Sequence, residues 1–320
     1  MDPREQRDDA RSGVSFCEVA LRDGLQSWPG FIPTADKIRL LRAIAGTGVD
    51  EVDVTSFVPS STVPQFADAE EVLAAVPDGP RVRVLTVNVK GVARVIEASR
   101  TVRRIDVCGM PLSASEAHNK ANLRRTKQDQ MAAMENMVGA LLDAGIAPLI
   151  GVVTAFGCPI QGAVPVDDVF EIVGWAHSLG VRSIMFGDTT GMGNPRQVGD
   201  LFRSARVEWP DAYLVGHFHD NRGAGIANSL AALDAGADMV DGSLGGIGGE
   251  PQVVDQGFVG TAGNTASEDL LSVLTAMGHL PGVDTAAMME AGALLQAVTG
   301  EPLFSRVQLA DGAGASAAHV

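Results

Sequence analysis

The sequence predicts an α/β protein built as a (β/α)8 TIM barrel with an additional C-terminal helical segment. Short apolar runs that are typical of buried strands alternate with amphipathic helical stretches, a pattern that indicates a parallel sheet. Eight such units occur, more than a doubly wound sheet usually needs, and this number favours the barrel. Polar residues also follow the ends of successive predicted strands, where a barrel builds its active site.

The elements follow one another in regular order along the chain. The predicted strands are Ser15–Leu21, Val49–Thr55, Arg81–Val87, Arg104–Gly109, Ala147–Ala155, Arg182–Phe186, Tyr213–Phe218 and Met239–Ser243. The predicted helices are Thr34–Thr47, Asp68–Ala75, Lys90–Ser99, Lys127–Ala144, Val166–Leu179, Pro195–Val207, Gly225–Ala235 and Ser267–Met277. Thr34 suits an N-cap and Pro195 suits a first helical turn, and both support the assigned helix starts.

The barrel domain is expected to span residues 14–280. Residues 1–13 are polar and charged, which predicts a disordered tail that is neither a signal peptide nor a membrane anchor. Residues 281–320 are expected to form a C-terminal helix, Thr285–Thr299, and a flexible tail. The apolar side chains of this helix predict a homodimer, or else a helix that covers its own barrel: Met288, Met289, Leu294, Leu295 and Val298.

Composition excludes several classes of function. A net charge of −15 argues against binding to nucleic acid or to an anionic membrane, and no run of 18 apolar residues predicts a membrane span. The three cysteines, Cys17, Cys108 and Cys158, include no CxxC pair and suit a reducing cytoplasm rather than a structural zinc cluster. We therefore expect a cytoplasmic protein.

His217-Phe218-His219-Asp220 closes one of the predicted strands. Residues two apart on a strand point to the same face, so both imidazoles are expected to converge at the carboxyl end of that strand. Two histidines and a nearby carboxylate would suit a divalent cation with positions left for water and substrate. The pair alone is also compatible with two ordinary surface or core histidines.

Chemically capable residues recur at the ends of other strands. These clusters are Arg22-Asp23-Gly24, Asp53 with Thr55-Ser56, Thr86-Val87-Asn88, Gly187-Asp188-Thr189, and the loop Gly245–Glu250 followed by Gly263-Asn264. One Asp-Gly pair is usually only a turn. Their repetition at the same end of successive strands predicts an active site at the barrel mouth.

Several of these stretches match one family. They are Arg22-Asp23-Gly24-Leu25-Gln26, Thr55-Ser56-Phe57-Val58, Val63-Pro64-Gln65, Ser113-Ala114-Ser115-Glu116, Gly157-Cys158-Pro159, Gly187-Asp188-Thr189, His217-Phe218-His219-Asp220, Ala227-Asn228 and Gly263–Asp269. Together they resemble the HMG-CoA lyase family, within the wider group of metal-dependent TIM-barrel enzymes related to isopropylmalate synthase. The Ser-Phe-Val and Gly-Cys-Pro stretches separate the lyases from the synthases.

The resemblance implies a metal site and a substrate site. Asp23, His217 and His219 would bind a divalent cation, Mg²⁺ or Mn²⁺ with Zn²⁺ or Co²⁺ as alternatives, and Asn264 would be a fourth ligand or contact the ligands. Arg22 would stabilise the developing enolate, and Asp53 stands near the substrate where the family usually has Glu. The remaining residues implied at the substrate are Gln26, Asn88, Ser113, Cys158 and Asp188.

One stretch departs from the family. Its glycine-rich loop normally carries a cysteine considered to act in proton transfer, in Gly-Gly-Cys-Pro, whereas this chain has Gly248-Gly249-Glu250-Pro251. Three interpretations remain open. Glu250 could replace the cysteine as acid or base with a raised pKa, water at the metal or Asp53 could move the protons, or the activity could be lost or redirected.

The first hypothesis is therefore a lyase that cleaves a 3-hydroxy-3-methylglutaryl-CoA-like thioester to acetyl-CoA and a keto product. Alternatives are a citramalyl-CoA or other acyl-CoA lyase, an aldolase of 4-hydroxy-2-oxo acids, a Claisen-type synthase, and a binding protein without activity. The partner would be a small acyl-CoA. Candidate cations for the CoA phosphates are Lys90, Lys120, Arg124 and Arg125.

Overall fold

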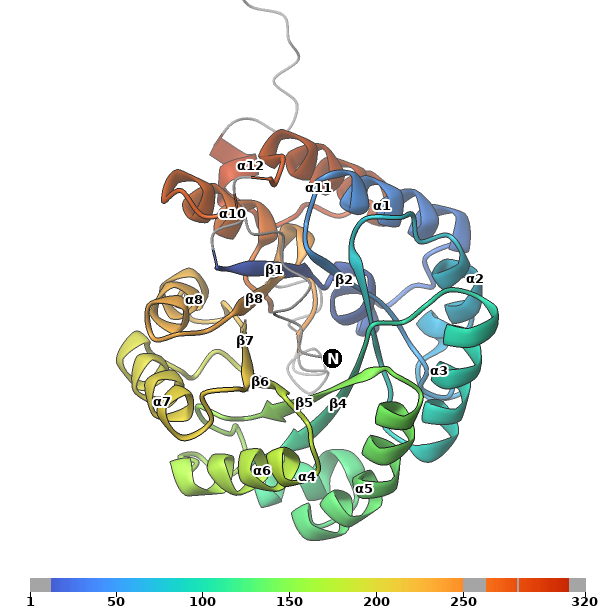
Figure 1. Cartoon of the computed structure of the whole chain (residues 1–320). Helices are drawn as coiled ribbons and strands as arrows, with labels where there is room; N and C mark the ends of the chain where they lie inside the picture. The colour runs from blue at the N-terminus through green and yellow to red at the C-terminus, as the bar shows by residue number, and fades with distance from the viewer. Residues whose placement is uncertain (1–12, 250–262, 281, 311–320) are drawn as a thin grey trace, which may run out of the picture.

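The computed structural model describes residues 13–249, 263–280 and 282–310. Within them, eight strands pair in parallel and close into a barrel in chain order, which confirms the predicted fold (Figure 1). The strands are β1 (Ser15–Glu18), β2 (Glu51–Ser56), β3 (Arg81–Leu85), β4 (Val107–Ser113), β5 (Ala147–Val153), β6 (Ser183–Asp188), β7 (Tyr213–Phe218) and β8 (Met239–Gly242).

Helices surround the strands in a ring (Figure 1). They are α1 (Thr34–Gly46), α2 (Ala69–Ala74), α3 (Val89–Thr101), α4 (Glu116–Leu123), α5 (Lys127–Asp143), α6 (Val166–Ser178), α7 (Pro195–Glu208), α8 (Gly225–Asp234), α10 (Ser267–Ala276), α11 (Thr285–Thr299) and α12 (Arg306–Ala310). Single turns also occur at η2 (Ala20–Gly24), η3 (Pro64–Phe66) and η4 (Leu244–Gly246).

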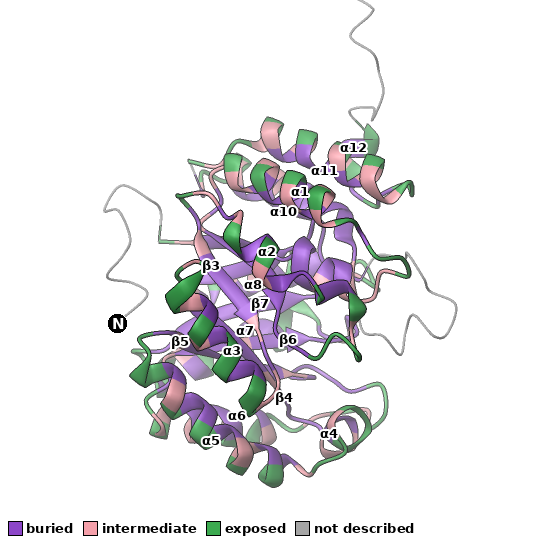
Figure 2. Cartoon of the chain, turned by 90° about the vertical axis from the view of Figure 1, so that its right-hand side faces the viewer, coloured by how far each residue is buried: buried purple, intermediate pink, exposed green. Residues whose placement is uncertain are grey.

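The main hydrophobic core lies between the strands and the helix ring, so the strands are buried and the outer helix faces are exposed (Figure 2). Alternation along β7 sends Phe218 outward, where its ring lies tilted against that of Phe202 in α7, with 6.4 Å between the ring centroids. The same alternation sends Tyr213, Val215 and His217 into the barrel interior. The side chains that fill the barrel therefore end in a histidine at the carboxyl end of the strand.

The interior of the barrel divides into an apolar half and a charged half. Its apolar side chains are Cys17, Val19, Val107, Leu149, Tyr213, Val215 and Met239. The inward positions of β2 and β3 instead carry Glu51, Asp53 and Arg83, all almost completely buried. These charged residues lie at different depths below the mouth of the barrel, because Glu51 begins β2, whereas Asp53 and Arg83 stand in the middle of β2 and β3.

The C-terminal helices α10, α11 and α12 gather on one side of the ring beside α1 (Figure 1). Met288 and Leu295 of α11 are buried in the main core of the chain. Part of the apolar face of α11 thus packs on its own chain, while Met289, Leu294 and Val298 stay half-buried. No helix in the described ranges has both the length and the apolar character needed to cross a membrane.

Candidate active site

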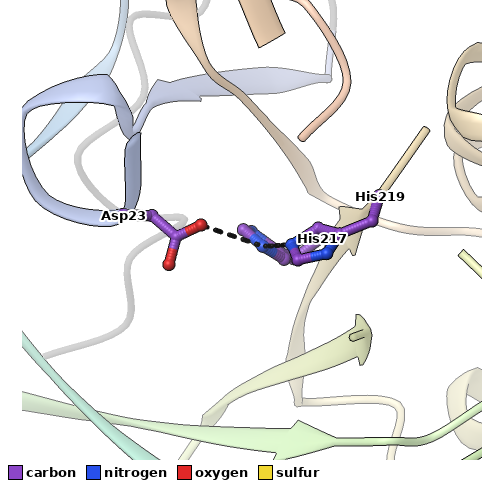
Figure 3. A group of neighbouring side chains, drawn as sticks. All are labelled: Asp23, His217 and His219. Atoms are coloured by element: carbon purple, nitrogen blue, oxygen red, sulfur yellow. Dashed lines mark hydrogen bonds and ion pairs between the residues drawn. The ribbon is translucent and has the colours of Figure 1, made fainter. Parts of the chain in front are cut away.

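His217 and His219 converge at the mouth of the barrel, as their spacing predicted. Their Nε2 atoms lie 3.1 Å apart, and Asp23 approaches from η2 with its Oδ2 atom 3.9 Å from His217 Nε2 (Figure 3). One ligand atom from each of the three residues lies within 4.8 Å of the others. Both histidines are buried, while Asp23 is partly exposed toward the mouth.

This arrangement fits a divalent cation. Two nitrogens that bind one ion at about 2.1 Å and at right angles lie about 3.0 Å apart, close to the separation found here. Two imidazoles and one carboxylate form a mixed nitrogen and oxygen donor set that leaves further positions for water or substrate. Asp23, His217 and His219 would therefore hold the ion on one side only.

The tight turn η2 brings Arg22 and Asp23 to this point. It is a single π-helical turn in which the backbone N–H groups of Asp23 and Gly24 both donate to the Val19 carbonyl. Gly24 is required by close packing, because a Cβ there would lie 2.7 Å from Ile247 Cγ1. The Asp-Gly pair is thus more than a generic turn: the glycine lets the loop after β8 approach the turn.

Arg22 joins the two acidic groups of the site. Its Nε donates to Asp53 Oδ2 at 2.7 Å, and its Nη1 donates to Asp23 Oδ1 at 2.6 Å. Burial alone would lower the pKa of the Arg22 guanidinium, but Asp53 and Asp23 outweigh that effect and raise it. The guanidinium is therefore a permanent positive charge fixed beside the candidate metal site.

Asp53 is the more unusual partner. Burial raises the pKa of the Asp53 carboxyl above its ordinary value, although Arg22 and Arg83 pull it down. Its Oδ1 atom is buried and has no hydrogen-bond partner among the described residues. One oxygen of Asp53 is thus committed to Arg22, while the other remains a buried acceptor.

Asn264 connects the segment after β8 to the ligands. Its backbone forms an isolated antiparallel bridge with His219. Its Nδ2 donates to Asp23 Oδ2 at 2.7 Å and to the Ile247 carbonyl at 2.9 Å. Asn264 therefore contacts the carboxylate oxygen that faces His217. Gly248 permits this arrangement, because a Cβ there would lie 2.5 Å from Asn264 Nδ2.

Asp188 and Ser113 end β6 and β4, but their polar atoms hold neighbouring loops. Asp188 accepts from the backbone N–H groups of Met192 and Gly193, and burial raises the pKa of its carboxyl. Ser113 Oγ lies 2.9 Å from Thr154 Oγ1. Both residues therefore lie at the carboxyl ends of their strands, at the mouth of the barrel.

The other residues expected at the substrate lie at varied depths. Cys158 is buried, and its Sγ accepts from the N–H groups of Ile160 and Gln161. Asn88 caps α3 by accepting from the Gly91 N–H, so its carboxamide oxygen has a structural partner. Gln26 is half-buried just after η2.

Two sets of predicted residues need separate comment. Glu250 lies outside the described residues. The cationic candidates Lys90, Lys120, Arg124 and Arg125 are all exposed, and Lys120 forms an ion pair with Glu116 of its own helix.

Sequence reasoning missed Asp241 and Arg83, which contact the site from below. Asp241 Oδ2 lies 3.1 Å from His217 Nδ1 and accepts from Arg83 Nη1 at 2.9 Å. A signal was available, since a charged residue between apolar residues in a predicted barrel strand points either to solvent or to a buried partner. The sequence gives Arg83 between Val82 and Val84, and Asp241 after Val240.

Fold and site together define a TIM-barrel protein with a candidate Asp/His/His metal centre next to a buried arginine. The HMGL-like family model matches residues 13–295. The chain therefore belongs to the HMGL-like family, and the resemblance drawn from its motifs is confirmed.

Individual relatives agree with this assignment. The chain is 36% identical over 282 residues to the cytoplasmic 3-hydroxy-3-methylglutaryl-CoA lyase of Rattus norvegicus, covering 87% of this chain and 79% of the relative. It is 30% identical to the hydroxymethylglutaryl-CoA lyase YngG of Bacillus subtilis, covering 92% and 95%. A solved HMG-CoA lyase from Acinetobacter baumannii, in complex with coenzyme A and 3-methylmalate, superposes with a TM-score of 0.85 at 33% identity, covering 98% of this chain and 99% of that one.

Proposed function

We propose that this chain is a divalent-metal-dependent carbon–carbon lyase that cleaves a 3-hydroxy-3-methylglutaryl-CoA-like thioester to acetyl-CoA and a keto product. The observation that carries the proposal is the convergence of Asp23, His217 and His219 beside the Arg22–Asp53 pair. This constellation occurs in a chain that is 30–36% identical to several hydroxymethylglutaryl-CoA lyases.

The reaction makes defined demands on the site. The 3-hydroxyl must lose its proton, the bond between C2 and C3 must break, and its electrons must pass into the thioester as an enolate. The enolate carbon then takes a proton to give acetyl-CoA, while the hydroxyl carbon becomes the carbonyl of the keto product. A bound Mg²⁺ or Mn²⁺ would supply Lewis acidity toward the hydroxyl and carboxylate oxygens of the substrate.

Arg22 and Asp53 provide the remaining charges. The Arg22 guanidinium stays protonated and is held by two carboxylates, so it is a fixed cation for the developing enolate oxygen. Asp53 offers Oδ1 as a buried acceptor for a proton, and burial raises the pKa of its carboxyl toward the range that suits a general base. Glu250 remains the other proposed acid or base.

The substrate would enter over the rim that Asp188, Ser113 and Cys158 shape. Asn264 would steady Asp23 through the hydrogen bond to its Oδ2 atom. We expect the CoA nucleotide to stay outside the barrel near the exposed cations of α4 and of the loop that follows, Lys120, Arg124 and Arg125. The support for a CoA thioester is the relative whose solved structure contains coenzyme A.

The decisive experiment is an assay of the purified protein with Mg²⁺ or Mn²⁺ against a panel of 3-hydroxyacyl-CoA thioesters. Acetyl-CoA formation from 3-hydroxy-3-methylglutaryl-CoA, lost on chelation and restored by added metal, is the expected result. Asp23→Asn and His217→Ala should abolish both turnover and metal retention while the fold persists. Full metal content and turnover in Asp23→Asn would refute the proposed site.

Homodimer formation and a cytoplasmic location belong to the same proposal. Met288 and Leu295 of α11 are used within the chain, whereas Met289, Leu294 and Val298 of the same helix are only half-buried and would be the part of this face left for a dimer. Sedimentation at micromolar concentration tests it: a clean monomer excludes the dimer. Among the relatives, one rat lyase is named cytoplasmic and another mitochondrial, so fractionation of the source cells must decide the location.

A further inference from the structure

Arg83 is a buried cation directly beneath the proposed metal site. It projects from the middle of β3, and only 3% of its side chain is exposed. Its Nε donates to Glu51 Oε1 at 2.5 Å, its Nη1 donates to Asp241 Oδ2 at 2.9 Å, and its Nη2 approaches Met239 Sδ at 3.2 Å. Burying a charge this deeply costs free energy of desolvation unless ion pairs and hydrogen bonds compensate it fully.

Glu51 and Asp241 are held differently. Glu51 binds Arg83 through one oxygen and Arg81 Nη1 through the other, at 3.2 Å, so both of its oxygens have cationic partners. Asp241 uses Oδ2 alone, while its Oδ1 atom is buried with no hydrogen-bond partner among the described residues. Arg83 is therefore the only cation in the described ranges that forms an ion pair with Asp241, histidine aside.

Asp241 connects Arg83 to His217, one of the proposed metal ligands. The Oδ2 atom that binds Arg83 also lies 3.1 Å from His217 Nδ1. A carboxylate accepts hydrogen bonds and cannot donate them, so Nδ1 must carry the proton. His217 Nε2 then presents a lone pair toward Asp23 and His219, which is the tautomer that a metal ligand requires.

We propose that Arg83 is a positioning residue for the metal site, which fixes Asp241 so that His217 presents its Nε2 lone pair toward Asp23 and His219. The inference rests on the proposed metal-dependent function. Arg83 in β3 is separated from the ligand His217 in β7 by the three intervening strands β2, β1 and β8. Arg83 touches no ligand itself. Without Arg83, Asp241 would be free to rotate and pair its open oxygen elsewhere, and the orientation of His217 would lose its support.

A double-mutant cycle tests the route through Asp241. Mn²⁺ binding to metal-stripped protein is measured by calorimetry for the wild type, Arg83→Met, Asp241→Asn and the double variant. Loss of such an outer contact typically weakens metal affinity about 10–100-fold. We expect a loss of this size in each single variant and no further loss in the double variant. Additive losses would show that Arg83 acts by another route, and would overturn the proposal.

Arg206→Met is the matched control. Arg206 also binds an aspartate of the region where β8 begins, with its Nη2 atom 2.6 Å from Asp238 Oδ2, and Asp238 accepts from the N–H of Leu214 in β7. This pair sits at the opposite end of the same two strands. Its removal should lower stability without changing Mn²⁺ affinity. If Arg206→Met lost as much Mn²⁺ affinity as Arg83→Met, the effect of Arg83→Met would be explained by general destabilisation of the fold.

The tautomer of His217 can be measured in protein that has neither bound metal nor activity. Nitrogen NMR of the metal-free wild type, under conditions where the imidazole is neutral, should show the proton of His217 on Nδ1, and Arg83→Met should shift it toward a mixture. If Arg83→Met does not fold, Arg83→Lys should give the same shift, because an ammonium cannot span Glu51 and Asp241. A wild-type proton on Nε2 would refute the inference even if the lyase is active. An inactive protein with the Nδ1 tautomer would refute only the function.

Discussion

Arg22 and Asp53 meet inside the barrel with 2.7 Å between Nε and Oδ2, and both side chains are almost completely buried. The pair comes from η2 and β2, and η2 follows β1, the strand that pairs with β2. Because the guanidinium also binds Asp23, the pair determines where a permanent positive charge stands relative to the proposed metal ligands. Several expectations depend on it.

Replacement of Arg22 should remove enolate stabilisation. Loss of one such donor typically lowers kcat by about 10²–10³-fold, and we expect this for Arg22→Met. Arg22→Lys should not restore the rate, since one ammonium cannot bind Asp53 and Asp23 through a planar fork. Steady-state kinetics checks this, with metal content measured in parallel. A normal kcat in Arg22→Met would assign the role to another residue.

Asp53→Asn should distinguish a role of Asp53 as proton acceptor from a role in orienting Arg22. An asparagine fills the same space and still offers an oxygen to Arg22, but it cannot accept a proton as a base. We expect a fall in kcat of about 10²-fold or more with little change in metal content. If kcat and its pH profile stay unchanged, Asp53 only orients Arg22, and proton transfer belongs elsewhere.

Gly248→Ala should disturb the metal site through Asn264. The new methyl group would lie 2.5 Å from Asn264 Nδ2, at a backbone φ of +105° that disfavours any side chain. The matched control is Gly300→Ala after α11, where φ is +72° and no atom lies within 4 Å. Both variants carry backbone strain, but only Gly248→Ala should weaken Mn²⁺ binding in calorimetry. Equal affinities would mean that Asn264 can move without effect on Asp23.

Glu18 should give stability a particular pH dependence. Burial raises the pKa of its carboxyl from 4.5 to about 8, while Ser267 and the N–H groups of Ala20 and Leu244 bind it. The folded protein therefore holds this proton more tightly than the unfolded chain. The stabilisation is complete below about pH 4.5, declines as pH rises toward 8, and declines no further above that value.

Glu18→Gln should flatten this decline, because a carboxamide satisfies the same partners without ionising. Urea unfolding of both proteins across roughly pH 5 to pH 9 measures the difference, which also cancels contributions from other groups such as Glu268. Parallel curves for the two proteins would show that Glu18 keeps an ordinary pKa.

The ligands that share one strand were accessible from sequence, because the period of two along β7 places His217 and His219 together. Asp23 followed from its position after the first strand and from the family motif. The π-helical turn that carries it was not predicted, since no local pattern specifies a turn whose geometry depends on packing against Ile247. The partner of Arg83 was equally inaccessible: its contact with Asp241 spans 158 positions and exists only after the sheet closes.

Some helices were missed for simpler reasons. α4 has a polar sequence without an apolar stripe, although Ser115 caps it by accepting from the His118 N–H and could have revealed its start. Conversely, α11 was predicted from its apolar side chains with the bounds that the structure shows, and in the structure Asp284 and Gly300 cap its two ends. Apolar periodicity thus located most elements, whereas a polar helix such as α4 and the contacts between distant strands needed the structure.

The hydrogen bond between Asn264 and Asp23 links residues 241 positions apart, and β1 pairs with β8 at the same closure. A chain synthesised from its N-terminus therefore has Asp23 long before it has the partners of that residue. No nascent fragment that stops before β7 offers the three-residue donor set. We therefore expect a metal ion to bind only after the last strands have paired with the first. Metal binding would then follow closure of the barrel and would not direct the early steps of folding.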